Sequence, residues 1–137
     1  MAPSKVLSTA STVINASAPM EFYWDDVNGP NQYYVYMYFA ELQELKANQS
    51  RLFKIYLNDQ LWVADNILVS YLTENVVRSI APLTLNDTYD FKLIMSEGST
   101  LPPILNAIEI YKVMNFPQLT TEQDDGNIYG HSSCSCL

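Results

Sequence analysis

One ten-residue segment alternates so regularly that it constrains the fold of this chain more than any other feature. From Gln32 to Glu41 the sequence reads QYYVYMYFAE. Successive side chains of a β-strand point to opposite faces, so a period of two residues predicts a strand. Both faces of this strand are expected to be apolar or aromatic. One would carry Tyr33, Val35, Met37 and Phe39, and the other Tyr34, Tyr36 and Tyr38.

Shorter segments of the same kind follow, separated by polar turns and prolines. Arg51 to Leu57 alternates, and Asn58-Asp59-Gln60 predicts a tight turn into LWVA, which makes a hairpin. The segment ELQELKA is too short for a dependable helix, so we expect a loop there. Five or more short strands without a long helical stretch predict an all-β fold, an antiparallel β-sandwich or jelly roll. The remaining strands are predicted at Asn75 to Ile80, Thr88 to Met95 and Leu105 to Val113.

Length and composition disfavour several classes of protein. A chain of 137 residues buries about 68–70% of its unfolded surface, which is enough for one core without disulfides. The net charge of −8 disfavours nucleic acid and anionic lipid as partners, because both require clustered Lys and Arg. One histidine, two cysteines and four glycines leave little material for a metal site, a Cys/His nucleophile or a phosphate loop. We therefore expect no cofactor and no metal.

The two ends carry few targeting signals. The first twenty residues lack the apolar run of a signal peptide, and no segment reaches the ~18 apolar residues of a membrane span. The final CSCL fits the C-a-a-X prenylation form, but its middle residues are not aliphatic and no basic cluster precedes it. We expect residues 118–137 to form a polar, disordered tail that includes His131, Cys134 and Cys136 without a chemical role for them.

Three N-glycosylation sequons begin at Asn15, Asn48 and Asn86, and none has proline in the middle. Chance alone supplies about one or two in a chain with this content of Asn, Ser and Thr. All three fall in predicted loops or at strand edges, where an attached glycan could remain in solvent. Their placement favours a secreted chain over coincidence.

Clustered aromatic residues form a second candidate feature. Sugar rings stack their C–H faces on aromatic side chains while neighbouring polar groups fix the hydroxyls. Packing within the sandwich is the competing explanation for each ring, including those of Phe22, Tyr23 and Trp24. The candidate ligand-binding residues are Tyr34, Tyr36, Tyr38 and Trp62.

The acidic residues of the sequence give little support for catalysis or for calcium binding. Asp25-Asp26 and Asp124-Asp125 are adjacent pairs, and neighbours in a strand point apart, so neither pair predicts a glycosidase. We expect Asp25 and Asp26 to lie in a solvated turn before Asn28-Gly29-Pro30. The segment Asp124 to Asn127 lacks the spacing and the bidentate Glu of a calcium loop. No catalytic residue is predicted.

Three stretches together resemble one known family. They are VLSTASTVINASAPMEFYW, YYVYMYFAELQELKANQSRLFKIYLNDQLW and STLPPILNAIEIYKVMNFPQLTTEQDD. Their most specific blocks are Phe39-Ala40-Glu41 and the segment from Leu101 to Glu109. The match, from about Pro3 to Asp125, resembles the malectin-like ectodomain of plant leucine-rich-repeat receptor kinases. It is similar to the second, C-terminal sandwich of the tandem pair in that family.

The resemblance implies a malectin (galactose-binding-like) β-sandwich over residues 3–117 that lacks an opening edge strand, which would leave an edge or a face uncovered. From Gly126 onward the sequence departs from the family, which implies a fragment, a splice form or an imperfect gene model. The family's kinase activity is not implied, because no glycine-rich loop, catalytic Asp or Asp-Phe-Gly motif is present.

The function implied is a non-catalytic extracellular recognition module at the plasma membrane. It would bind an oligosaccharide, a secreted peptide, an adjacent sandwich or a co-receptor in cell-surface signalling. Two alternatives remain open at this point: a purely structural spacer without a ligand, and a truncated decoy that pairs with full-length receptors.

Overall fold

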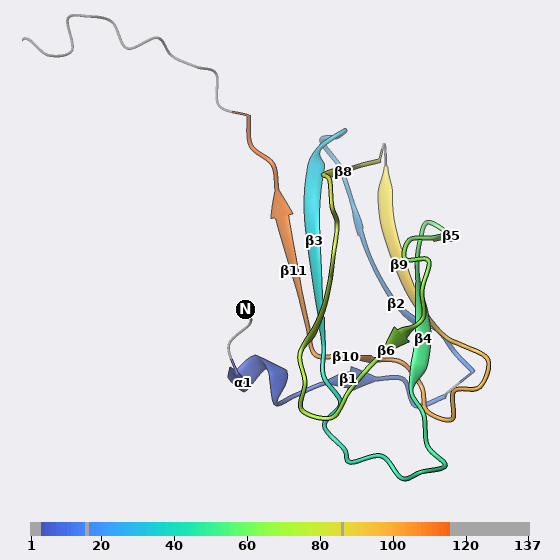
Figure 1. Ribbon diagram of the computed structural model, residues 1–137. Coiled ribbons are helices and arrows are strands. Elements are labelled where there is room, and N and C mark those ends of the chain that lie inside the picture. The colour runs from blue at the N-terminus through green and yellow to red at the C-terminus, as the bar shows by residue number, and fades with distance from the viewer. Residues whose placement is uncertain (1–3, 16, 86, 116–137) are drawn as a thin grey trace, which may run out of the picture.

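The computed structural model describes residues 4–15, 17–85 and 87–115, which form two antiparallel sheets packed face to face (Figure 1). One sheet has the order β11-β3-β7, with β8 also paired to β3; the other has the order β2-β9-β4-β5, with β6 also paired to β4. A short pair, β1 with β10, lies at the base beside the single helical turn α1. The bounds are α1 Ser4–Leu7, β1 Ser11–Thr12, β2 Met20–Asp25, β3 Gln32–Phe39, β4 Leu52–Leu57, β5 Gln60–Leu61, β6 Ile67–Leu68, β7 Asn75–Arg78, β8 Leu83–Thr84, β9 Thr88–Met95, β10 Ile104–Leu105 and β11 Ala107–Lys112.

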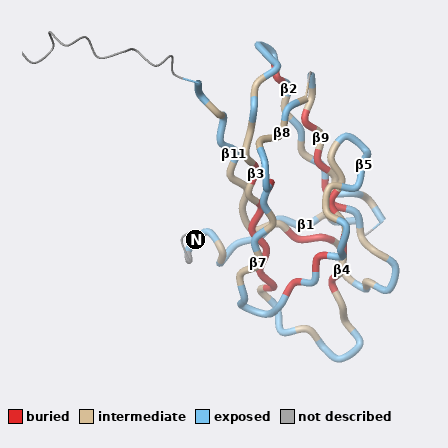
Figure 2. The backbone as a smooth tube through the Cα atoms, turned by 45° about the horizontal axis from the view of Figure 1, so that its top comes forward, coloured by how far each residue is buried: buried red, intermediate tan, exposed pale blue. Residues whose placement is uncertain are grey.

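The core lies between the two sheets, where Figure 2 shows the buried stretches of the backbone facing one another. Strands β4 and β9 bury alternate residues, as their sequence periods predict, and β3 buries Val35, Met37 and Phe39 in the same way with Tyr38 buried in addition. The apolar interior is therefore made by the middle strands of both sheets, and the sandwich expected from the sequence is confirmed. Side chains with no exposed surface include Val35, Met37, Phe39, Phe53, Ile55, Tyr89, Phe91 and Leu93.

Strand β3 is the centre of its sheet and carries aromatic residues on both faces, as predicted. Its inward set packs in the core, except that the Tyr33 ring is only partly buried against it. Its outward tyrosines lie between β11 and β7: Tyr36 is opposite Glu109 on one side and Arg78 on the other. This register places one strand's tyrosines at the middle of an outward-facing surface.

The predicted hairpin is confirmed. Asn58 and Asp59 both adopt positive φ, 47° and 61°, the conformation of a type I′ turn. The Asn58 side chain also donates to the Thr88 carbonyl oxygen at 2.8 Å and accepts from the Asp90 N–H at 2.8 Å. The turn is thus fixed by the neighbouring strand as well as by its own sequence. Segment 42–50 contains no helix, as expected.

The last predicted strand is divided into β10 and β11 by Asn106. The Asn106 N–H donates to the Tyr38 carbonyl oxygen at 3.0 Å, and its side-chain oxygen accepts from the Ala40 N–H at 2.7 Å. Its side-chain amide donates to the Thr9 carbonyl oxygen at 3.1 Å. One asparagine therefore breaks the ladder and ties the N-terminal segment to the end of β3.

Strand β2 was not predicted, and it forms the edge of the five-stranded sheet. Its inward rings lie on β9: Trp24 is parallel to Tyr89 with ring centroids 4.8 Å apart, and Phe22 is stacked on Phe91 at 5.3 Å. Among the longer described strands, β2, β7 and β11 each pair on one side only.

The expectation that Asp26 is solvated is wrong, because its side chain is only 7% exposed. Its carboxylate accepts the Asn31 N–H at 2.6 Å, the Asn31 side-chain amide at 2.5 Å and the Tyr33 hydroxyl at 3.2 Å. The bond from the Asn31 backbone, followed by those from side chains, holds the pKa of Asp26 below its usual value. Glycine is required at position 29, since a Cβ there would lie 2.5 Å from an Asp26 oxygen. Asp26 thus organises the β2–β3 loop.

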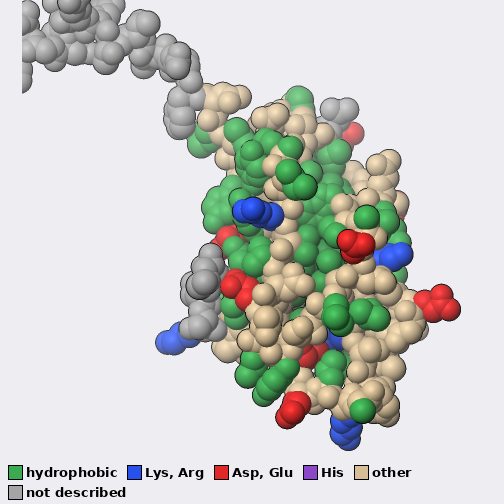
Figure 3. All heavy atoms as spheres, in the orientation of Figure 1, with side chains coloured by type: hydrophobic (Ala, Val, Ile, Leu, Met, Phe, Trp, Pro, Cys, Tyr) green, Lys and Arg blue, Asp and Glu red, His purple; other side chains and the backbone are tan. Residues whose placement is uncertain are grey.

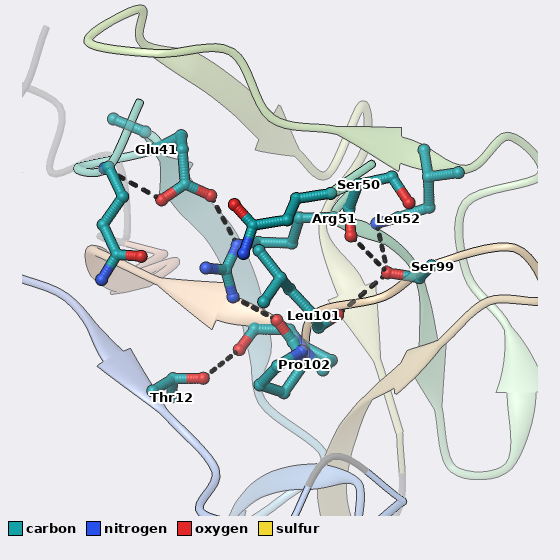
Figure 4. A network of polar contacts seen from close by, with 12 residues as sticks. Thr12, Glu41, Ser50, Arg51, Leu52, Ser99, Leu101 and Pro102 are labelled. Carbon is teal, nitrogen blue, oxygen red and sulfur yellow. Dashed lines mark hydrogen bonds and ion pairs between the residues drawn. The ribbon is translucent and has the colours of Figure 1, made fainter. Parts of the chain in front are cut away.

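The two blocks that carry the family resemblance meet at the base of the sandwich (Figure 4). Arg51 Nε donates to Glu41 Oε2 at 2.6 Å, and both side chains are buried. Arg51 Nη1 donates to the Pro102 carbonyl oxygen, while the Gln43 N–H donates to Glu41 Oε1 at 3.1 Å. Arg51 thereby joins the end of β3 to the proline segment before β10.

Candidate recognition surface

The outward side chains of β3, β11 and β7 form one surface, which we call the tyrosine face. Its members come from positions that alternate with core residues, so the pleat that buries the core also exposes this set. Three of the four predicted ligand-binding residues are on it. The tyrosine face consists of Tyr34, Tyr36, Tyr38, Val76, Arg78, Ala107, Glu109 and Tyr111.

Glu109 connects two tyrosines of this face. The hydroxyls of Tyr38 and Tyr111 donate to the same Glu109 oxygen at 2.9 and 3.0 Å. Tyr111 also meets Tyr36 edge to face, with ring centroids 5.7 Å apart and an interplanar angle of 90°. The rings are therefore held in fixed orientations before any ligand arrives.

Burial and the Glu109 carboxylate together raise the pKa of Tyr38 to about 12. The hydrogen bond to Glu109 also raises the pKa of Tyr111 above its usual value. Both hydroxyls thus remain protonated at neutral pH and act as donors to Glu109. The lone pairs of the exposed Tyr111 hydroxyl remain available as acceptors for a ligand.

The tyrosines differ in exposure. The Tyr38 side chain is only 4% exposed, Tyr34 and Tyr36 are half-buried, and Tyr111 is 53% exposed. A hollow of about 400 Å³ lies over the face and is lined by Tyr36, Tyr38, Val76 and Arg78. The hollow combines the surface of aromatic rings with the Arg78 guanidinium, and the Glu109 carboxylate lies on the other side of Tyr36. This combination suits a sugar ring or a peptide side chain.

Trp62, the fourth predicted residue, lies elsewhere. It follows β5 in the other sheet, where its N–H donates to the Ile55 carbonyl oxygen at 2.9 Å and its ring meets Phe91 edge to face at 5.1 Å. It lines a groove between the sheets and not the hollow over the tyrosines. The four predicted residues therefore do not form a single site.

Sequence reasoning missed Glu109, Tyr111 and Arg78 as members of the surface. The signal for the first two was present, because they alternate with Ile108 and Ile110 in the last predicted strand. Pairing of β11 and β7 with β3 could not be read from the sequence, and that pairing brings these side chains beside the tyrosines.

The outer face of the five-stranded sheet has a different character. Lys92 lies at its middle and contacts carboxylate oxygens of Asp59 at 2.7 Å, Asp90 at 3.2 Å and Glu21 at 3.5 Å. Hydrogen bonds to Asp59 and Asp90 raise its pKa. The polar groups of this outer face mostly hydrogen-bond to one another, so the tyrosine face is the stronger candidate for a recognition surface.

Two of the three sequon asparagines are described, and both are exposed. Asn15 follows β1 and its side-chain oxygen accepts from the Ser17 N–H at 3.0 Å, while Asn48 lies in a turn of the loop between β3 and β4. Asn86 lies outside the described residues, as do the tail positions Asp124, Asp125, His131, Cys134 and Cys136. Exposure meets the steric requirement for a glycan at Asn15 and Asn48.

Within residues 4–15, 17–85 and 87–115, no group of three His, Cys, Asp or Glu side chains is arranged to hold a metal ion. In the same ranges no helix has the length and apolarity needed to cross a bilayer.

The fold and surface define an antiparallel β-sandwich with an aromatic outward face, and comparison with known proteins identifies its family. Residues 1–113 match the malectin-like domain, so the chain belongs to the malectin-like domain family. The family indicated by Phe39-Ala40-Glu41 and the Leu101–Glu109 segment is thus confirmed.

Sequence relatives are receptor kinases of Arabidopsis thaliana. The chain is 43% identical over 124 residues to the probable LRR receptor-like serine/threonine-protein kinase At5g59680, and 40% identical over 125 residues to the receptor-like protein kinase At5g59670. Each match covers 90% of this chain but only 14% of the relative. The chain therefore spans about one seventh of these proteins, and the region matched is a malectin-like domain and not a kinase domain.

A solved structure confirms the fold. The crystal structure of the plant receptor-like kinase ANX2 superimposes with a TM-score of 0.65 at 18% identity, covering 82% of this chain and 33% of that one. At that identity the likeness establishes the sandwich architecture alone.

Proposed function

We propose that this chain is a non-catalytic recognition module from the extracellular part of a plant receptor-like kinase. Membership of the malectin-like family and relatives that are receptor kinases support this proposal. The exposed Asn15 and Asn48 sequons fit a location on the outer side of the plasma membrane. In this proposal residues 3–117 form the module, residues 118–137 form a polar tail, and glycans occupy Asn15, Asn48 and Asn86.

The proposed contact surface is the tyrosine face. The observation that supports this choice most strongly is the pair of hydrogen bonds from Tyr38 and Tyr111 to Glu109, beside the Tyr36 ring. Aromatic rings fixed in this way lose little conformational entropy when a ligand binds. Tyr34 and Tyr36 offer ring surface, and Tyr111 offers a ring edge and a hydroxyl. The ligand class that this chemistry fits is an oligosaccharide or a secreted peptide.

A second candidate function is a spacer that packs against a neighbouring sandwich. The near-complete burial of Tyr38 favours this candidate, because that side chain has little area left for a small ligand. A half-buried aromatic sheet face is also suited to a protein interface, so an adjacent sandwich or a co-receptor would occupy the same surface. A decoy role would be a special case, with a full-length receptor as the partner.

The two functions are separated by a screen with isotope-labelled full-length chain. Cell-wall oligosaccharides and small secreted peptides are added singly, and perturbed amide resonances are mapped. Recognition predicts a compound that perturbs β3 and β11 amides at submillimolar concentration. If every compound leaves those amide resonances unchanged while a receptor sandwich from the same family perturbs them, the spacer function is supported and the recognition function is contradicted.

A further inference from the structure

A groove of about 630 Å³ opens on the side of the sandwich, between segments 62–64 and 76–83. One wall belongs to the five-stranded sheet and includes Trp62, and the other is the edge of the four-stranded sheet formed by β7 and the segment that follows it. Figure 3 shows hydrophobic side chains gathered between the two sheets on the face toward the viewer. Arg78 is the one charged residue among the groove's eleven lining residues.

The outer edge of β7 faces this groove. The Ser79 N–H donates to the Val35 carbonyl oxygen at 3.0 Å, so residues of odd number direct their main-chain groups toward β3. Because antiparallel ladders alternate, the N–H and C=O groups of Val76 and Arg78 point away from β3 and toward the groove. No other described strand pairs with that edge. Its lower end is closed, since the Asn75 side-chain amide donates to the Leu68 carbonyl oxygen at 3.2 Å.

Two side chains along this edge, those of Arg78 and Ile80, are also left open to a partner. Arg78 makes no hydrogen bond or ion pair with any described residue, although the chain carries 15 acidic residues. Ile80 is 99% exposed and lines the groove, so it adds to the apolar surface available there. An open strand edge, an apolar groove and a free guanidinium therefore lie together.

We propose that the outer edge of β7 binds an extended acidic peptide as an additional strand. A peptide residue hydrogen-bonded opposite Arg78 would point its side chain to the same face as Arg78, so a carboxylate is favoured there. The residues before and after it would point the other way, into the groove beside Trp62, so they are apolar. Main-chain bonds supply affinity and the alternating side chains supply specificity, as in other strand-addition complexes. This site shares Val76 and Arg78 with the tyrosine face, but its main-chain groups and the groove beside Trp62 lie apart from the tyrosine rings.

The test uses the full 137-residue chain and a capped heptapeptide with valine, glutamate and valine at its centre. We expect binding at submillimolar concentration, with slowed exchange of the Val76 and Arg78 amides. N-methylation of the central glutamate removes the donor that faces β7 and should weaken binding at least tenfold. N-methylation of a flanking valine, whose N–H points to solvent, is the matched control and should weaken it much less.

Charge reversal tests the role of Arg78. Arg78→Glu should weaken the glutamate peptide at least tenfold and strengthen a peptide with lysine at the same position. Lys46→Glu makes the same charge change in the exposed 42–50 loop and should have little effect. Equal affinity of the two peptides for the wild-type chain would overturn the proposal, as would absence of binding at millimolar concentration. Concentration-dependent protection of the same amides without peptide would assign the edge to a second copy of the chain instead.

Discussion

Glu41 and Arg51 illustrate how single residues hold the two family blocks together. Their ion pair is shielded from water, and each partner also binds backbone, at the Gln43 N–H and at the Pro102 carbonyl oxygen. A buried pair contributes little relative to apolar replacements, but removing one partner leaves a buried charge without compensation.

Glu41→Gln should therefore lower the free energy of unfolding by about 3–5 kcal/mol. Glu44→Gln changes an exposed glutamate of the adjoining loop and should stay within about 0.5 kcal/mol of the wild type. Urea unfolding followed by fluorescence measures both values. Equal stability of the two variants would show that the ion pair does not hold the base together.

Asp26 makes stability depend on pH in a specific direction. Its pKa is lowered in the folded state from an ordinary value of 3.8. Its contribution is therefore complete above that pH and is lost as the pH falls through the folded pKa. The stability difference between the wild type and Asp26→Asn should be constant near neutral pH and should shrink below pH 3.8. Urea unfolding of both proteins across that range measures it. A difference that stays constant in acid would contradict the assigned contacts.

At the scale of elements, periodicity predicted the strands that bury alternate residues on both sides of the core. Strand β9 matches its predicted span, and β4 begins one residue late. Strand β2 escaped prediction because Phe22, Tyr23 and Trp24 are consecutive aromatics, which hide the alternation between ring-stacked and solvent-facing positions. The division at Asn106 was equally hidden, because it depends on contacts with Tyr38, Ala40 and Thr9 from distant segments.

The stacking of β2 on β9 leads to a prediction for this element. Trp24→Ala removes the ring that lies on Tyr89 and Phe91. It should lower the free energy of unfolding by about 2–4 kcal/mol, which is less than the loss expected for a fully buried ring because Trp24 is only partly buried. Tyr23 is on the opposite face of the same strand and is 69% exposed. Thermal unfolding of Tyr23→Ala supplies the control and should be near that of the wild type. A larger loss of stability in Tyr23→Ala than in Trp24→Ala would show that Tyr23, and not Trp24, faces the core.

At the scale of the whole molecule, the sequence was sufficient for the sandwich and for its family but not for the grouping of candidate residues. Tyr34, Tyr36 and Tyr38 share a strand, so their common face follows from alternation alone. Trp62 was grouped with them by residue type, but sheet pairing places it beside the β7 groove. Arg78 was not predicted at all, and it borders both that groove and the hollow over the tyrosines.

The central claim is that the tyrosine face contacts the ligand, and the most direct measurement compares three variants against the ligand that the screen identifies. Tyr36→Ala and Tyr111→Ala should each weaken binding at least tenfold, because each removes a ring from this face and breaks the edge-to-face pair. Tyr23→Ala removes an exposed tyrosine from the opposite sheet and should leave the affinity unchanged. If all three variants, each shown to be folded, bind as tightly as the wild type, the tyrosine face is not the recognition surface.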